Sequence, residues 1–511
     1  MTIRKPPIIL FALCLLLAFS CKKWDNYNAS QDSALNNNVL TAINNNADLS
    51  VFAGYLAKTG YDKIIASSKT FTVWAPNNAA MQLVDPTILS DTAKVKQFVG
   101  NHITTQQYFT ADVKTFLYIK TLNGKNITFT KTTVDDQPIV KADQYAANGV
   151  IHIISSAIIP KPNALQYLLS TSLKQKTEMV SLNYTAFDKT IAVQTGIDPK
   201  TGLPIYKAGT GIVNLNRFTD LAPIGNEDSL YTYVILTDAA YNTEKANLAK
   251  FYASTSPTVS DSITNFNVIK SLSFKGLYNS DAFPDTVYST VDSVKFKLKK
   301  SDIVETHRVS NGIVYVMNSI SYKLYGQAND RFTKIKPIVI QGEKIDSMLS
   351  AKSPIIRTRR NPDSSLYKDI ILENHGVSSF WFNYRTPANA VKYKVYWRVT
   401  RDYSLTLSGT ATDLTYFPMS VAFGSQSAIA FTQPKPGVID NGVSAPAGKR
   451  FTANYSEVYL GDYVSPSFYS GNKKDAGGLL NFLSIFLVGN NVTTNGANTL
   501  LLDYIKLVPT P

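Results

Sequence analysis

Side chains between Phe71 and Ala75 fall alternately on two faces, which is the two-residue period of a β-strand. Pro76 follows at once and ends the strand, because it has no N–H group to donate to a neighbouring strand. Asn77 or Asn78 can then cap a helix whose first turn holds two alanines and a methionine. The segment 71–81 therefore predicts a strand, a corner and the start of a helix.

The same order of features returns later in the chain. The segment 231–241 is again an apolar strand followed by a Thr-Asp cap and an apolar helix start. An Asn-Gly pair with an apolar run begins at Asn148, 77 residues after Phe71, and another begins at Asn311, 80 residues after Tyr231. Two unrelated patterns that recur in one order at nearly one spacing predict a tandem duplication of a compact domain.

Both segments resemble the two hallmark segments of the fasciclin (FAS1) family, which are a strand ending in Ala-Pro before a helix and an Asn-Gly followed by an apolar strand with a central His. The first copy fits with Ala75-Pro76 and His152, and its Leu122-Asn123-Gly124 is similar to a hairpin of the family. The second copy is divergent, because it lacks the Ala-Pro pair and has Tyr315 where the His would stand.

The pair Asn101-His102, just before Ile103, is similar to the family's Tyr-His dipeptide, which has been linked to adhesion. The resemblance implies that Asn101 and His102 are a candidate adhesion motif, and packing inside the domain is the alternative. His152 lies in an apolar strand, so we expect a core histidine that is hydrogen-bonded within the domain.

The first domain is expected over residues 32–162 and the second over 163–327, each an α+β fold with helices and a mostly antiparallel sheet. The stretch 196–204 is rich in turn residues and has no period, which predicts an inserted or lengthened loop in the second domain. Before the strand at Phe71, apolar residues recur at helical spacing. They are Leu35, Val39, Ile43, Leu49, Phe52, Leu56 and Ile64.

The helical spacing of apolar residues largely disappears in residues 331–511. Short strand-like runs alternate with clusters of Gly, Pro, Asn and Ser, the pattern of an all-β sandwich of jelly-roll type. The alternation from Val391 to Val399 places five apolar or aromatic residues on one face, which belongs in a core. The closing stretch 500–509 resembles the last strand of galactose-binding-like and carbohydrate-binding sandwiches. The predicted fold class is tandem α+β FAS1-like domains followed by an all-β sandwich.

Four residues of this part are candidates for ligand binding. On the predicted strand around Trp381, a phenylalanine-rich face alternates with a face that holds Trp381 and Arg385. If the phenylalanine face is core, Trp381 and Arg385 are exposed and, with Tyr396 and Arg398, could stack on a sugar ring and hydrogen-bond to its hydroxyls. The alternative is that these side chains pack between the sheets.

The N-terminus has the pattern of a signal peptide over residues 1–20. Arg4 and Lys5 precede an apolar run, Ile8 to Phe19, that is too short to span a bilayer comfortably. We therefore expect export from the cytoplasm.

The four residues that end at Cys21 resemble a bacterial lipobox, in which the Cys receives lipid. The resemblance implies lipidation of Cys21, a polar tether over residues 21–31 and a place at the outer membrane with the face left open. A plain secretory signal with an incidental Cys is the alternative. Cys14 would leave with the signal, so the mature chain could form no internal disulfide.

The chain is basic, with 51 Lys and Arg against 37 Asp and Glu, a formal net charge of +14. The only dense basic cluster is Arg357, Arg359 and Arg360. No recognised nucleic-acid motif is present, so we do not expect a nucleic-acid partner. Attraction to anionic glycans or lipid headgroups is one interpretation of the charge, and a merely soluble surface is the other.

Motifs of catalysis are missing from the sequence. There is no nucleophile elbow, zinc-protease motif, phosphate-binding loop or dinucleotide fingerprint. The four histidines lack metal-ligand spacing. We therefore expect no metal, no cofactor and no enzyme, although a glycosidase can place its two acids far apart in sequence.

The sequence predicts a non-catalytic envelope lipoprotein for adhesion or recognition of glycan or extracellular matrix, whose tandem modules would add weak binding sites. One alternative is a glycan-binding accessory of a polysaccharide-uptake system. Another, different in class, is a hydrolase with its site in the C-terminal sandwich.

Overall fold

The computed structural model describes residues 33–326, 330–400, 418–433, 438–439, 443–444, 455–471, 482–494 and 498–511. The signal peptide, Cys21 and the tether lie outside these residues. The chain forms two compact units. The N-terminal unit runs to Asn163 and includes 226–228 and 308–311, and the C-terminal unit holds the rest. These units do not separate the second domain from the sandwich, so the domain boundaries at 162, 327 and 331 stay predictions.

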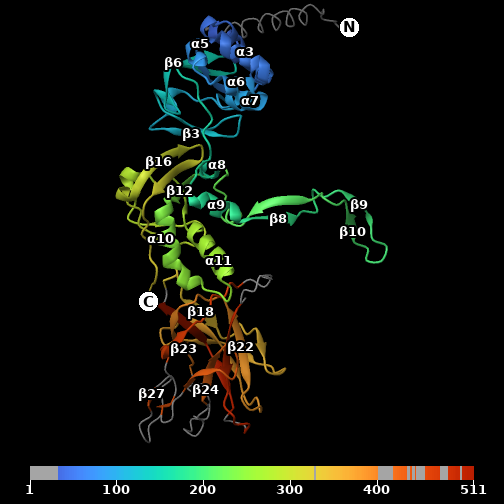
Figure 1. Ribbon diagram of the computed structural model, residues 1–511, viewed down its shortest axis with the longest axis vertical. Coiled ribbons are helices and arrows are strands. Elements are labelled where there is room, and N and C mark those ends of the chain that lie inside the picture. The colour runs from blue at the N-terminus through green and yellow to red at the C-terminus, as the bar shows by residue number, and fades with distance from the viewer. Residues whose placement is uncertain are drawn as a thin grey trace, which may run out of the picture. The chain divides into compact units, whose positions relative to one another are not determined.

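The first domain combines short helices with one sheet of seven strands (Figure 1). Its α-helices are α2 (Val39–Asn44), α3 (Ser50–Thr59), α4 (Tyr61–Ile65), α5 (Asn78–Gln82), α6 (Pro86–Ser90) and α7 (Thr92–Gly100). Its strands are β1 (Phe71–Pro76), β2 (Ile103–Thr104), β3 (Leu117–Lys120), β4 (Asn126–Phe129), β5 (Thr133–Val134), β6 (Gln137–Ala146) and β7 (Gly149–Ile154). The sheet order is β2-β1-β7-β6-β5-β4-β3, and β1 and β7 are parallel.

Strand β1 lies between two hydrophobic cores, so all six of its residues are buried. Phe71, Val73 and Ala75 pack with the helices, whereas Trp74 packs in a second cluster with residues of β3, β4 and β5. The alternation read from the sequence is therefore confirmed as the division between two cores. Asn77 is the helix cap, because its Oδ1 accepts from the N–H of Ala80 at 2.8 Å.

Two residues of the predicted helical face were assigned wrongly. Leu35 is 41% exposed and Ile64 is 43% exposed, whereas Ile65 is fully buried. Gly60 explains the second error, because its φ of +77° ends α3 and lets α4 begin in a new direction. A left-handed residue between two helices resets the helical phase, so spacing counted across it gives the wrong face.

The second domain repeats this topology. Its α-helices are α8 (Ala164–Ser170), α9 (Lys174–Ser181), α10 (Asp238–Ala249) and α11 (Pro257–Ile269). Its main strands are β12 (Tyr231–Leu236), β13 (Ser273–Lys275), β16 (Ile303–Val309) and β17 (Gly312–Met317), with β14 (Val287–Tyr288) and β15 (Lys295–Phe296) as a separate pair. The order β13-β12-β17-β16 matches β2-β1-β7-β6 of the first domain.

The two copies agree residue by residue in register. Phe71 is opposite Gly149 in the parallel pair of the first copy, and Tyr231 is opposite Gly312 in the second. The threonine that follows each strand start also makes the same bonds. Thr72 donates to the carbonyl of Gln106 in the first copy, and its counterpart donates to that of Gly276 in the second. The predicted duplication is confirmed.

The stretch 196–204 is part of an arm rather than an irregular loop. The antiparallel pair β8 (Asn183–Phe187) and β11 (Ile212–Asn216) leads to a second pair, β9 (Gln194–Ile197) and β10 (Pro204–Tyr206). Figure 1 shows these strands extending away from the body of the second domain. The predicted loop is the turn of this second pair, since residues 198–203 lie between β9 and β10, whereas the strands on either side of it were not predicted.

The C-terminal part is built from antiparallel strands, as predicted. They are β18 (Ile338–Gln341), β19 (Ser347–Met348), β20 (Ile355–Arg360), β21 (Leu366–Leu372), β22 (Trp381–Thr386), β23 (Lys392–Arg398), β24 (Met419–Phe423), β25 (Ile429–Gln433), β26 (Val438–Ile439), β27 (Val443–Ser444), β28 (Val458–Val464), β29 (Leu483–Val488), β30 (Leu500–Leu502) and β31 (Tyr504–Thr510). The two larger sheets have the orders β18-β31-β23-β28 and β19-β22-β29-β24-β25, and a smaller sheet is β20-β21-β30.

The core face predicted on the strand from Val391 to Val399 is confirmed, because all five of its residues are buried. The closing stretch 500–509 forms two strands instead of one. Its first part pairs with β21 and its second part with β18 and β23. Asp503 lies between the two strands, so this break places a buried carboxylate at the junction of two sheets.

Candidate functional site

The Asn-Gly pairs are structural in both copies. Asn148 accepts a hydrogen bond from the N–H of Val39 at 2.8 Å and donates to the carbonyls of Ile65 and Ser67, so one side chain joins three segments. A Cβ atom at Gly149 would lie 2.1 Å from the carbonyl oxygen of Phe71, and one at Gly312 would lie 1.8 Å from that of Tyr231. Only glycine allows this close approach of two strands.

The candidate adhesion motif lies inside the first domain. Asn101 is 1% exposed and His102 is fully buried. His102 accepts from the N–H of Ile158 at Nε2 (2.9 Å), so its Nδ1 carries the proton and donates to the carbonyl of Phe98 (2.8 Å). Burial lowers the pKa of His102 to about 4, which keeps the ring neutral. In the folded domain these two side chains are therefore not available to an outside partner.

His152 is a hydrogen-bonded core residue, as expected. Its Nε2 donates to the carbonyl of Tyr108 at 2.9 Å, and its Nδ1 accepts from the N–H of Asp143 at 3.2 Å. Tyr315 occupies the equivalent place in the second copy and donates to the carbonyl of Tyr278 at 2.8 Å. The divergent residue thus preserves the hydrogen bond with different chemistry.

The residues opposite His152 and Tyr315 on the neighbouring strand differ in size. His152 is opposite Trp74, and Tyr315 is opposite Val234. The larger ring in the second copy therefore faces the smaller neighbour, as close packing requires.

The four candidate residues of the sandwich lie on two different sheets. Trp381 and Arg385 belong to β22, whereas Tyr396 and Arg398 belong to β23. The Trp381 ring meets Phe486 edge-on, with 5.3 Å between ring centroids, and Arg385 is ion-paired with Asp346 at 3.0 Å. The structure does not bring the four residues together into one surface.

Arg398 lies in a polar hollow of about 520 Å³. Its guanidinium contacts the Asp503 carboxylate at 3.0 Å, donates to Asn361 and lies 4.5 Å from the centre of the Tyr367 ring. Tyr396, by contrast, lies beside Lys506, whose Nζ is 5.6 Å from its ring centre. The hollow is lined by Gln341, Glu343, Thr358, Asn361, Leu366, Tyr367, Lys368, Arg398, Asp503 and Tyr504.

Four side-chain polar atoms of this hollow are buried without a hydrogen-bond partner among the described residues. They are Oε2 of Glu343, the hydroxyl oxygen of Tyr367, Nε of Arg398 and Oδ2 of Asp503, the last of which is ion-paired with Arg398. Buried polar atoms in native proteins are nearly always satisfied, so each such atom calls for an explanation, such as a bound polar group. Burial raises the pKa of Asp503 to about 7, with Arg398 opposing the rise.

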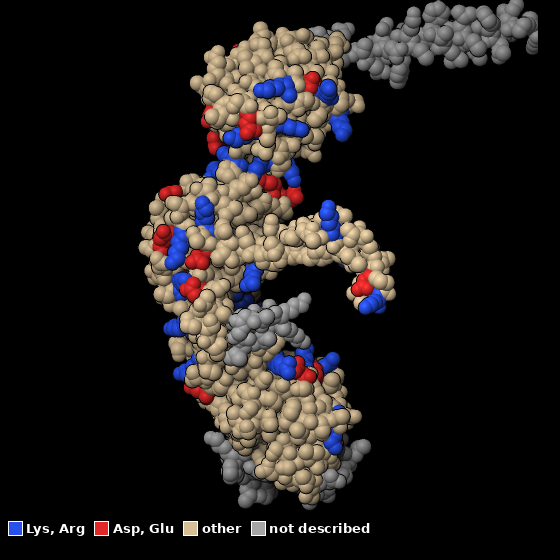
Figure 2. Space-filling view, turned by 45° about the vertical axis from the view of Figure 1, so that its right-hand side comes forward, with Lys and Arg blue, Asp and Glu red and all other residues tan. Residues whose placement is uncertain are grey.

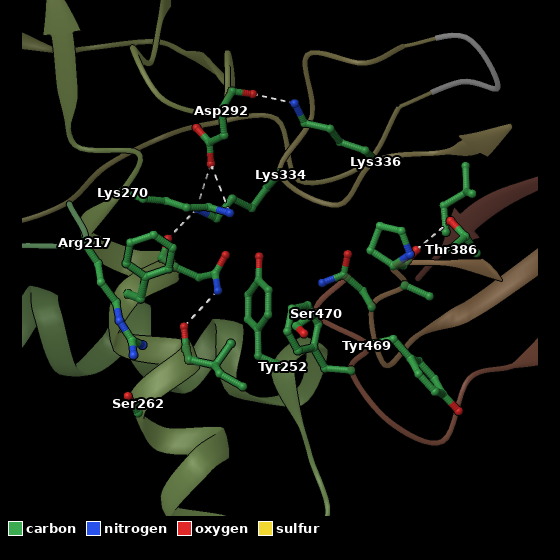
Figure 3. Close-up of a pocket in the computed structure, with 18 of the residues that line it drawn as sticks. Arg217, Tyr252, Ser262, Lys270, Asp292, Lys334, Lys336, Thr386, Tyr469 and Ser470 are labelled. Carbon is green, nitrogen blue, oxygen red and sulfur yellow. Dashed lines mark hydrogen bonds and ion pairs between the residues drawn. The ribbon is translucent and has the colours of Figure 1, made fainter. Parts of the chain in front are cut away.

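A second cavity, of about 640 Å³, lies in the C-terminal unit where the second domain meets the sandwich (Figure 3). Helix α11 and the segment 334–338 line it from one side, and 386–389 and 468–470 of the sandwich line it from the other. Backbone bonds join its two sides, because the N–H of Ala390 donates to the carbonyl of Phe251 and that of Phe468 to the carbonyl of Ala253.

Lysines gather around one carboxylate in this cavity. Lys334 and Lys270 lie 3.6 and 3.9 Å from Oδ2 of Asp292, and Lys336 donates to its backbone carbonyl. Burial alone would raise the pKa of Asp292, but Lys334 and Lys270 hold it at about 2. Burial and the charge of Lys334 lower the pKa of Lys270 to about 8. Sequence reasoning missed this cavity, because its residues come from distant segments.

Charged side chains of both signs lie on the surface outside this cavity (Figure 2). On the face shown in Figure 2, basic side chains are interspersed with acidic ones. Arg357, in the basic cluster, is held bidentately by the buried Asp369 at 2.9 and 2.7 Å. Among the described residues, no group of His, Cys, Asp and Glu is placed to hold a metal ion, and no helix there has the length and apolarity to cross a membrane.

Comparisons with known proteins agree with this architecture. Residues 47–160 match the model of the Fasciclin domain family, so the chain contains a fasciclin domain over those residues. No curated protein matches the chain. The second domain repeats the topology and register of the fasciclin domain, and an all-β sandwich follows.

Solved structures resemble parts of the chain at low identity. A pair of FAS1 domains from the insect cell adhesion molecule fasciclin I is 14% identical and covers 53% of this chain and 96% of its own, with a TM-score of 0.22. The CBM36-1 domain of a xylanase from the hindgut metagenome of Trinervitermes trinervoides is 12% identical, covers 34% of this chain and 99% of its own, and has a TM-score of 0.20. A carbohydrate-binding module of Cellvibrio mixtus lichenase 5A, in complex with cellotriose, is 12% identical and covers 34% and 98%, with a TM-score of 0.18. These likenesses are too weak to argue from, and the fold assignment rests on the strand pairing.

Proposed function

We propose that this protein is a non-catalytic lipoprotein of the cell envelope that recognises glycan or extracellular matrix. The observation that carries the proposal is the hollow beside Arg398, in which buried polar atoms of Glu343 and Arg398 lack partners in the described chain. In this proposal a lipid on Cys21 holds the protein at the outer membrane. The match of residues 47–160 to the Fasciclin domain family supports the adhesion part of the proposal by analogy alone.

The chemistry of the hollow suits a ligand rich in hydroxyl groups. A sugar hydroxyl both donates and accepts, so it suits a lining that holds carboxylate, amide, hydroxyl and guanidinium groups. The rings of Tyr367 and Tyr504 are the aromatic components of the lining. The hollow is also within the usual volume range of small-ligand sites.

One specific feature favours the hydrolase as a second candidate. Two carboxyl groups, Glu343 and Asp503, line the same hollow, and the pKa of Asp503 is raised to about 7, as that of a general acid often is. The ion pair between Asp503 and Arg398 argues for a structural role, because it stabilises the charged carboxylate. Binding and turnover therefore have to be measured on the same sample.

The test is a glycan panel presented to the purified full-length protein, followed by calorimetry on any hit. Glu343→Gln keeps the shape and removes one acceptor of the hollow, so we expect a loss of affinity of about tenfold or more. Glu373→Gln, which removes an exposed carboxylate outside the hollow, is the matched control and should bind normally. Release of reducing ends would instead support the hydrolase, and absence of all binding would leave adhesion through the fasciclin domains.

The anchor and the location are tested separately. Replacement of Cys21 by Ser should abolish acyl labelling and release the protein from the membrane fraction. Labelling of intact cells should reach the wild-type protein from outside. Confinement to the periplasmic side would contradict both adhesion and glycan capture.

A further inference from the structure

The cavity between the second domain and the sandwich carries an excess of positive charge. Lys270, Lys334, Lys336 and Arg217 line it, and among the described residues of the lining Asp292 is the one carboxylate. Figure 3 shows Lys270 and Lys334 both reaching toward Asp292. The carboxylate of Asp292 also accepts hydrogen bonds from the hydroxyls of Ser271 at 2.7 Å and of Ser289. Its negative charge is therefore stabilised by these hydroxyls as well as by the lysines.

The remaining nearby acid balances only part of this charge. Glu244 accepts a hydrogen bond from the hydroxyl of Tyr322, and burial raises its pKa. Lys334 is buried and donates to the carbonyl of Asn267 and the hydroxyl of Ser271. Lys334 is the buried ammonium group, whereas the Lys270 side chain is 23% exposed and Arg217 is exposed. The cationic side chains around the cavity outnumber the carboxylates, and a further anion would offset this excess. The net positive charge of the cavity lining therefore favours a negatively charged ligand.

Its other walls suit a ring that bears hydroxyl groups. The aromatic side chains of Tyr252, Phe266 and Phe468 line it, and Asn389 and Thr386 add an amide and a hydroxyl. An inorganic ion alone would leave most of a volume of about 640 Å³ unfilled, whereas one or two sugar rings are of that size class.

We propose that this cavity binds an anionic sugar of a glycan, with a carboxylate or sulfate group placed against Lys270 and Lys336. The inference goes beyond the proposed function, because it concerns a cavity separate from the hollow beside Arg398 and a different ligand charge. Both halves of the cavity are needed, so the second domain and the sandwich act as one binding unit.

The experiment uses the full-length protein and calorimetry with three probes, an oligogalacturonate, a sulfated galacto-oligosaccharide and a neutral galacto-oligosaccharide. We expect at least one charged probe to bind, with affinity that falls as salt is raised, and the neutral probe to bind at least tenfold more weakly in this cavity. The first two probes distinguish carboxylate from sulfate as the recognised group.

Lys270→Gln should weaken binding of the charged probe at least tenfold, and Lys336→Gln provides a second variant if the first unfolds. Lys300→Gln removes an exposed lysine outside the cavity, lowers the net charge equally and should bind as wild type. Equal loss in the control, equal binding of charged and neutral probes, or no binding of either charged probe would overturn the inference. Binding that depends on Glu343 but not on Lys270 would also overturn it while leaving the proposed function standing.

Discussion

The sharpest test of the duplicated fold is the substitution Gly149→Ala. Its Cβ would lie 2.1 Å from the carbonyl oxygen of Phe71 and 2.9 Å from a methyl group of Val39. Carbon–oxygen contacts between strands are ordinarily about 3.3 Å or longer. Strand β7 would thus have to move by more than about 1 Å away from β1, the strand that separates the two cores. We expect destabilisation at the upper end of the overpacking range, about 3 kcal/mol.

Gly54→Ala is a matched control in the same domain. Gly54 lies in α3, and a Cβ atom there would meet nothing within 4 Å. Alanine is the better helix former, so this variant should gain about 0.5–1 kcal/mol. The same Gly-to-Ala change is therefore expected to lower the unfolding free energy at position 149 and to raise it at position 54.

Hydrogen exchange followed by mass spectrometry measures both variants region by region in the full-length protein. A loss of about 3 kcal/mol corresponds to exchange faster by roughly 100-fold for the slowest amides of β1 and β7. Peptides from β12 and β17 should be unchanged and serve as an internal reference. Wild-type protection in Gly149→Ala, or equal deprotection in Gly54→Ala, would refute the steric argument.

Three further outcomes are expected. Arg357→Met breaks a bidentate pair with a fully buried carboxylate and should cost about 3 kcal/mol in denaturant unfolding, whereas the exposed Arg360→Met should stay within about 0.5 kcal/mol. The raised pKa means that the folded state keeps a proton on Asp503 up to about pH 7, whereas the unfolded chain loses it near pH 4. The wild type should therefore lose unfolding free energy relative to Asp503→Asn as pH rises from about 4 to 7. A difference that does not change with pH would contradict the raised pKa. In a double-mutant cycle by thermal unfolding, His152→Tyr should be tolerated better with Trp74→Val than alone, by about 0.5–3 kcal/mol, and strict additivity would contradict the packing argument.

Local periodicity was enough to predict much of the fold. The two-residue period of β1 depends only on side-chain direction along one strand, and the structure places its two faces in two cores. The duplication could be read because each hallmark segment combines a strand with a fixed turn or cap. The helical face went wrong at Ile64, where the left-handed Gly60 resets the phase. A glycine that precedes a new helix is a signal that could have corrected it.

The candidate sites were harder to predict, because sequence alternation gives the face of a strand but not its sheet. Alternation placed Trp381 and Arg398 opposite a core face, but Trp381 packs against a further hydrophobic cluster, Arg398 is buried, and their strands belong to different sheets. Pairing of strands far apart in sequence decides this, and no local pattern records it. The break at Asp503, an acid within an apolar run, is the one local sign of the hollow, since a charged residue there needs a partner such as Arg398.

The cavity lined by Lys270, Lys334 and Lys336 holds positive charge at a cost to the stability of the folded state. The pKa of Lys270 is lowered to about 8, so at neutral pH the folded state holds a charge that it disfavours. The folded protein releases this proton more readily than the unfolded chain, so this group makes the protein more stable as pH rises from about 8 to 10.5. Asp292 would keep Lys334, Ser271 and Ser289 as partners without Lys270. A bound anion beside Lys270 would favour its charged form and so raise its pKa back toward the ordinary value, which is the behaviour expected of a lysine in an anion site.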